Sequence, residues 1–179
     1  MSSSLRKHLV FILIFLIYII SASLWSFVEL QRFYSFHEHV YDLGGMVSFL
    51  YSIARTYSFK NLLLLVPSSK PFVLFISYIT LIFPNPVDFL YIQAFGTLLA
   101  SLFIYLLARR KFNSELLATL LTLSFIFFFP FSWYLFFDFH IAGFFSVFFF
   151  GALYFINSRP KLSFILFLNQ YCAKLLFVY

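Results

Sequence analysis

The chain has 179 residues, of which 63% are hydrophobic and only 10% are charged. So little polar surface cannot cover a water-soluble globule of this size, and the composition therefore excludes a soluble domain and predicts a protein that uses lipid as its solvent. The net charge of +6 does not indicate nucleic-acid binding, because the twelve Lys and Arg residues are scattered and partly flank apolar runs. In that position they are typical of topology determinants and lipid headgroup contacts.

The apolar runs are continuous over roughly 18 residues or more, which is the length that a helix needs to cross a bilayer. Strands of a transmembrane barrel would instead alternate apolar and polar residues. We therefore predict an all-α integral membrane protein with about five transmembrane helices, at residues 10–28, 87–108, 114–129, 141–156 and 162–179. The first run is longer than a signal-peptide core, and no small-residue cleavage site follows it before Glu29, so we interpret it as a retained helix.

Basic residues predict the orientation of these helices. Arg6 and Lys7 precede the first helix and place the N-terminus in the cytoplasm, and the basic cluster at residues 109–111 marks a return to that side. A crossing at residues 71–84 would put this cluster outside, and that stretch is short for a span and bounded by prolines. Residues 30–85 are therefore predicted to form one external juxtamembrane segment in the interface, within a single-domain, multi-pass protein of the cell membrane.

Residues 41–56 of this segment fit an amphipathic helix that lies along the membrane surface. Its predicted apolar face consists of Met46, Phe49, Leu50, Ile53 and Ala54, while Ser48, Ser52 and Arg55 lie elsewhere on the helix. Gly44 and Gly45 are expected to let the backbone turn sharply just before this helix, because glycine adopts conformations that other residues avoid.

Acidic residues are distributed unequally in this topology. Five of the six fall on the external side, namely Glu29, Glu38, Asp42, Asp88 and Asp138, and only Glu115 lies inside. Asp42 either caps the amphipathic helix or presents a carboxylate at the bilayer surface, where it would act as a general base or hold a divalent cation. His37 and His39 share a face only in an extended segment, which makes them weaker candidates for metal ligands.

A second polar cluster, Asp138 and His140, lies at an external corner between two predicted helices. The corner has a structural interpretation, in which Trp133 and Tyr134 form an interfacial aromatic belt. Ionisable groups so deep in apolar sequence are costly, however, which makes them functional candidates. If the two external loops meet, Asp42, Asp138 and His140 would supply the oxygen and nitrogen ligands that a divalent metal ion accepts. Farther along, Gln170 and Lys174 lie on one helical face and are expected to face the bundle interior.

Several short motifs occur in a particular order along the chain: Tyr41-Asp42-Leu43-Gly44, then Pro71 with Tyr78 and Phe83-Pro84, then Gln93-Ala94, and then Phe137-Asp138-Phe139-His140. Together they resemble the predicted membrane proteins of domain of unknown function 2079. That family in turn resembles the superfamily of C-type glycosyltransferases, which use lipid-linked sugars. The resemblance covers nearly the whole chain as the N-terminal portion of a longer protein, and we expect the apolar run that ends at Tyr179 to be cut off there.

The resemblance implies juxtamembrane helices in the first external loop and two catalytic acidic residues: Asp42 near the acceptor, and Asp138 at a metal ion or the donor phosphate. We therefore expect a membrane-embedded glycosyltransferase that takes a sugar from a polyprenyl-phosphate carrier on the non-cytoplasmic side. Basic side chains would contact the lipid phosphate, namely Arg55, Lys60 and Lys70.

The alternative is a truncated or degenerate, non-catalytic protein that acts as a scaffold or as a partner of further membrane subunits. Ser68 and Gln170 favour this alternative, because the family pattern leads us to expect a histidine near the first position and an acidic residue at the second. A transporter is less favoured, since the sequence contains no internal repeat.

Overall fold

A computed structural model describes residues 3–35, 40–56, 71–128 and 141–175 of the chain, and these ranges are helical, with no strand among them. The predicted all-α class is confirmed. The elements are α1 (Ser3–Tyr34), α2 (Val40–Thr56), α4 (Pro71–Ile82), α5 (Pro86–Leu98), α6 (Ala100–Phe112), α7 (Glu115–Ile126), the 3₁₀ turn η1 (Ile141–Phe144), α9 (Phe145–Phe155) and α10 (Pro160–Leu175).

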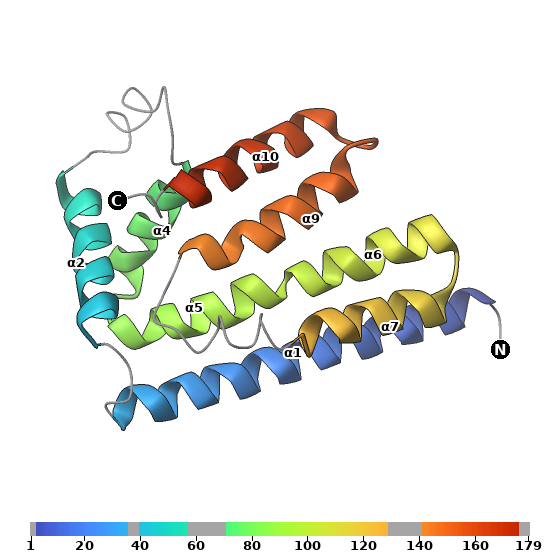
Figure 1. Ribbon diagram of the computed structural model, residues 1–179, viewed down its shortest axis with the longest axis horizontal. Helices are drawn as coiled ribbons and strands as arrows, with labels where there is room; N and C mark the ends of the chain where they lie inside the picture. Colours follow the sequence, from blue (N-terminus) through green and yellow to red (C-terminus); the bar gives the residue numbers. More distant parts are fainter. Residues whose placement is uncertain (1–2, 36–39, 57–70, 129–140, 176–179) are drawn as a thin grey trace.

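The long helices run lengthwise through the molecule, and α2 and α4 run across one end of it (Figure 1). At this end, which we call the α2 end, α1 finishes and α5 begins. The opposite end, which we call the basic end, holds the start of α1 and the α6–α7 and α9–α10 connections. Helix α1 packs along α5, α6 packs on α7 and α9, and α9 packs on α10.

In the part of the chain that the structure describes, two stretches are long and apolar enough to span a membrane, namely His8–Tyr34 and Pro86–Phe112, with 27 residues each. At a rise of about 1.5 Å per residue, such a helix is ~40 Å long and exceeds the ~30 Å of a hydrocarbon core. The second stretch combines α5 and α6, because Leu99 between them keeps right-handed helical angles and its N–H donates to the carbonyls of Phe95 and Gly96. Both predicted helices, 10–28 and 87–108, are therefore present and extend farther than expected.

The later helices are shorter than expected. Helix α7 has 12 residues and α9 has 11, whereas spans were predicted at residues 114–129 and 141–156. Twelve residues measure ~18 Å along a helix, which is well short of a hydrocarbon core. The first four residues of the predicted 141–156 helix form η1 instead, and residues 129–140 and 176–179 lie outside the described part of the chain. A five-span architecture thus stays a prediction.

Helix α2 differs from expectation where it begins. Gly44 and Gly45 lie inside the helix, and none of the glycines in the described residues has a positive φ, so the turn predicted before the helix is wrong. Two glycines cost a helix about 1 kcal/mol each relative to alanine. Burial of Leu43 and Val47 on either side offsets that cost. Asp42 consequently belongs to the first turn of α2 and does not precede it as a cap.

The buried face of α2 consists of Leu43, Val47, Leu50 and Ala54. The first three pack with Ile76 of α4, Phe89 and Leu90 of α5, and Phe144 of η1. Leu50 and Ala54 were predicted correctly, and Ile53 packs at the margin of this core. Phe49 was assigned to the wrong face, since it is 48% exposed, and the side chain of Met46 lies outside the description. Ser48, Ser52 and Arg55 are exposed as predicted.

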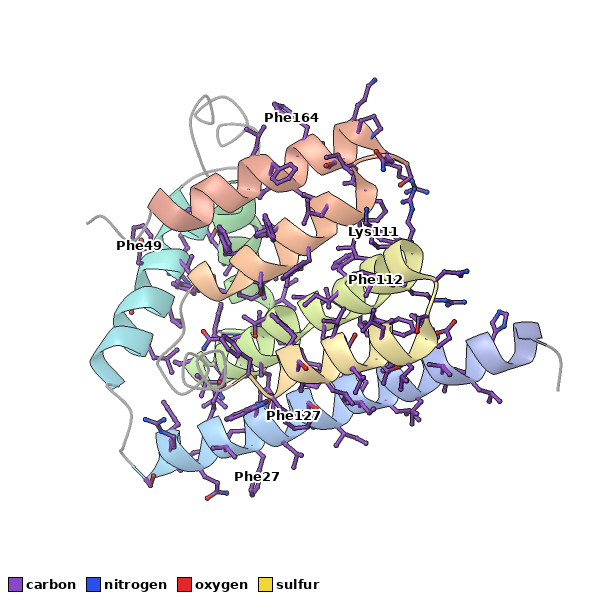
Figure 2. The ribbon with its side chains drawn as sticks, turned by 45° about the vertical axis from the view of Figure 1, so that its right-hand side comes forward. Phe27, Phe49, Lys111, Phe112, Phe127 and Phe164 are labelled. Carbon is purple, nitrogen blue, oxygen red and sulfur yellow. The ribbon has the colours of Figure 1, made fainter. Side chains whose placement is uncertain are left out.

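Helix α1 has one inner and one outer apolar face. The inner face packs on α5, α6 and α7 through Ile14, Tyr18 and Ala22, and the Tyr18 hydroxyl donates a 2.9 Å hydrogen bond to the Phe95 carbonyl. The outer face is an exposed stripe with helical spacing, formed by Leu9, Leu13, Leu16, Ile20, Leu24 and Phe27. Figure 2 shows Phe27 on α1 and Phe164 on α10 directed away from the bundle. An apolar surface of this extent is typical of contact with lipid.

Candidate functional site at the α2 end

Acidic residues gather at the α2 end because of how the helices are arranged. Helix α1 runs antiparallel to α5, so the last turns of α1, which carry Glu29, lie at the same end as the first turn of α5, which carries Asp88 (Figure 1). Helix α2 crosses this end with Asp42 in its own first turn. Three of the five acidic residues predicted to be external therefore share one end of the bundle. Glu38 and Asp138, the other two, lie outside the described residues.

Glu29 is fully buried, although it lies in α1, an apolar helix whose outer face is exposed. Removing a carboxylate from water is costly, so a buried one in a spanning helix is a functional candidate by default. Glu29 was predicted to lie just beyond the first helix, among the external acidic residues, and its burial was not predicted. The spacing of the inner face would have identified its direction, because Ala22, Ser26 and Glu29 are buried at intervals of four and three residues. Gln93 on α5 is also fully buried.

The described structure does not test whether the proposed metal ligands lie close together. Asp42 has a defined backbone position, but its side chain lies outside the description. Asp138 and His140 fall in residues 129–140, and Lys60 and Lys70 fall in residues 57–70, all outside the described part. Among the described residues, no group of three or more His, Cys, Asp or Glu side chains could hold a metal ion. The site formed by Asp42, Asp138 and His140 stays a prediction.

Arg55 lies in the last turn of α2, where a positive charge interacts favourably with the helix dipole. Its guanidinium carbon is 4.5 Å from the centroid of the Tyr51 ring, one turn earlier, in a cation–π contact that holds it on the helix surface. Asp42 and Arg55 are thirteen positions apart, or ~20 Å along the helix axis. They therefore cannot contact the same small chemical group, which the sequence alone did not reveal.

A polar cluster at the basic end was missed by the sequence analysis. Oε1 of the Glu115 carboxylate forms an ion pair with Nε of Arg109 at 2.8 Å. Its Oε2 accepts a 2.6 Å hydrogen bond from the Tyr105 hydroxyl. The turn between α6 and α7 creates this geometry. Asn113 adopts a left-handed conformation with φ 50°, and the Ser114 hydroxyl caps α7 by accepting from the Leu117 N–H at 3.3 Å.

Removing the Glu115 carboxylate should destabilise this hairpin. Tyr105 is fully buried, so Glu115→Ala would leave its hydroxyl without its acceptor and remove the partner of Arg109. Hydrogen bonds to charged groups contribute about 1.5–3 kcal/mol, and we expect a loss of ~2 kcal/mol of unfolding free energy in detergent micelles. Glu115→Gln keeps an acceptor for Tyr105 and should lose less. Equal stability of Glu115→Ala and the unaltered chain would show that the cluster contributes nothing.

A helical bundle with an apolar outer surface and, among its described residues, two helices of spanning length is typical of an all-α membrane protein. The model of the family described as "Predicted membrane protein (DUF2079)" matches residues 32–170, which is 139 of the 179 residues. The chain belongs to this family, as its motifs indicated. Comparisons with curated proteins and with solved structures return no match.

Proposed function

We propose that the chain is a membrane-embedded, glycosyltransferase-like protein that moves a sugar from a polyprenyl-phosphate carrier to an acceptor on the non-cytoplasmic side. The observation that supports this most is the placement of α2. This helix carries Asp42, lies across the end of the bundle, and is fixed there by its buried face on α4 and α5. A lipid-linked sugar presents its phosphate at the membrane surface, which is where a helix of this orientation would meet it.

The distribution of charge supports the orientation. The last turn of α6 carries Arg109, Arg110 and Lys111, and the α9–α10 connection is flanked by Arg159 and Lys161. All five belong to the basic end, together with the start of α1 (Figure 1). By the positive-inside tendency this end faces the cytoplasm. The α2 end, with its acidic residues, then faces the opposite side of a multi-pass protein.

In this proposal Asp42 accepts the proton of the acceptor hydroxyl as that oxygen bonds to the anomeric carbon of the sugar. The bond between this carbon and the phosphate oxygen breaks at the same time, and polyprenyl phosphate leaves with the electron pair. Asp138 and His140 would hold a divalent metal ion, which would supply positive charge to the leaving phosphate. Lys60 and Lys70 remain candidates for contacts with the same phosphate.

Arg55 has a different role in this proposal from the one that the sequence predicted. Its distance from Asp42 along α2 separates it from the reacting phosphate. It would instead contact headgroups of surrounding lipids and help to keep α2 at the surface, since each basic residue near an anionic surface contributes about 1 kcal/mol.

Transfer by the purified chain tests the proposal. The chain is reconstituted in liposomes that contain a polyprenyl-phosphate sugar with a radioactive label, and the label is followed into a water-soluble or lipid acceptor. Label transferred only when the chain and a divalent cation are present supports the enzyme. A chain that transfers nothing alone, but does so when membrane subunits that co-purify with it are added, would support an enzyme that those subunits complete. Absence of transfer under both conditions contradicts the proposal.

A further inference from the structure

A surface hollow of about 260 Å³ lies between α1 and α6 at the basic end. It is lined by His8 and Phe11 of α1 and by Leu106 and Arg109 of α6. Two of these side chains are apolar and two are basic, and the surface that they present to the hollow is almost wholly apolar. The volume is close to the lower end of sites for small molecules, at about 300–1,000 Å³, and suits a headgroup with the first carbons of a chain.

The charge around the hollow is positive. The last turn of α6 carries three basic residues, Arg109, Arg110 and Lys111, whereas the first turn of α7 carries one acidic residue, Glu115. Arg110 and Lys111 are exposed, and Figure 2 shows Lys111 at the end of α6 beside Phe112. Such a surface is complementary to an anion.

Arg109 is held in a fixed position by its ion pair. Glu115 binds the guanidinium through Nε, and Glu115 is itself oriented by the hydrogen bond from buried Tyr105. A guanidinium has five N–H donors, of which the one on Nε makes the ion pair, and the Arg109 guanidinium also hydrogen-bonds with the Tyr105 side chain. The donors on the two terminal nitrogens of a guanidinium form the planar fork that recognises phosphate in a bidentate manner.

The depth of the hollow in the bilayer points to one kind of ligand. His8 lies five residues after the start of α1 at Ser3, and Arg109 lies three residues before the end of α6 at Phe112. The basic groups therefore lie at headgroup level, while Phe11 lies one turn deeper at the level of the first acyl carbons. We propose that this hollow binds one anionic phospholipid, with its phosphate at Arg109 and His8 and an acyl chain along Phe11 and Leu106. The proposal does not depend on sugar transfer at the opposite end.

Native mass spectrometry of the full chain in detergent tests this site. The protein is titrated with phosphatidylglycerol in the presence of excess phosphatidylcholine, and the fraction of chains that retain one phosphatidylglycerol is measured. Arg109→Gln should weaken retention about fivefold, which corresponds to the ~1 kcal/mol that one basic residue contributes near an anionic lipid. Phe11→Trp should also weaken it, because the larger ring fills the hollow at unchanged charge.

The double variant Arg159→Gln/Lys161→Gln is the matched control, since both residues are exposed at the same end but do not line the hollow. Its retention of phosphatidylglycerol should equal that of the unaltered chain. Equal losses in the control and in Arg109→Gln would overturn the proposal by showing a diffuse charge effect. So would unchanged retention in both Arg109→Gln and Phe11→Trp, or displacement of the lipid by inorganic phosphate, which would show a site for the free anion.

Discussion

Asp42→Asn should lower the rate of sugar transfer in reconstituted liposomes by about 10²-fold or more. General base catalysis by a positioned carboxylate contributes typically 10²–10⁴-fold, and an amide cannot accept the proton. The substitution keeps the shape of the side chain, and α2 is fixed by the apolar contacts of Leu43, Val47 and Leu50. The folded state should therefore be preserved, and retention volume in size-exclusion chromatography checks this directly.

Asp88→Asn is the matched control for that experiment. Asp88 belongs to the first turn of α5 at the same end of the bundle, but its place is explained by the start of that helix, where Asn85 caps the chain by accepting from the Val87 N–H. A negative charge there stabilises the helix by about 0.3–1 kcal/mol, so its loss should reduce stability slightly and leave transfer intact. If Asp42→Asn transfers sugar as fast as Asp88→Asn, Asp42 is not the base.

The sequence predicted the fold class and the two long helices because both rest on local properties. Continuous apolar residues from α1 and from α5 to α6 are sufficient evidence for a helix in lipid, and no partner segment has to be known. The apolar face of α2 was only partly predicted, because it depends on more than local properties. Helical periodicity identified Leu50 and Ala54. The centre of the buried face, however, is set by the positions of α4 and α5, and Phe49 lies outside it.

Glycine illustrates what local interpretation misses. Gly44 and Gly45 suggested a turn, but glycine permits unusual backbone angles without requiring them, and tertiary packing kept both in a helix. The cluster of Tyr105, Arg109 and Glu115 was predictable in principle, since Asn113 and Ser114 are typical of a helix end followed by a helix start. The burial of Glu29 likewise needed only the spacing of α1.

Contacts between segments that are distant in the chain could not be predicted from the sequence. Gly96 of α5 and Phe144 of η1 are 48 positions apart, and nothing in their spacing indicates that they meet. A Cβ atom added at Gly96 would overlap the ring of Phe144, so this ring packs directly against the backbone of α5 only because position 96 has no side chain. A glycine in a helix interior costs about 1 kcal/mol relative to alanine. The close contact with Phe144 explains why position 96 is nevertheless a glycine.

This contact also concerns the candidate site, because Phe144 follows His140 by four residues. Phe144 is buried among Leu43, Leu50, Phe89 and Leu90, so it anchors the chain that follows residue 140 to both α2 and α5. In the proposed function, the position of Asp138 and His140 relative to Asp42 depends on this anchor.

Gly96→Ala should therefore destabilise the protein by about 1–3 kcal/mol, which is the usual cost of forcing extra atoms into a packed core. Gly151→Ala is the matched control, because the nearest atoms to its added Cβ are side-chain atoms of Leu166 and Phe103 at 3.4 Å, in ordinary contact. There the gain in helix propensity, about 1 kcal/mol, should leave stability equal or higher.

The double variant Gly96→Ala/Phe144→Leu distinguishes this overlap from a general effect of alanine in α5, because the smaller side chain removes the ring that the new methyl group meets. Its loss of stability should be smaller than the sum of the two single losses, as measured by thermal unfolding in detergent. Additive losses, or equal stability of Gly96→Ala and Gly151→Ala, would show that η1 does not rest on Gly96. If the anchor holds, Gly96→Ala should also slow sugar transfer, whereas Gly151→Ala should not.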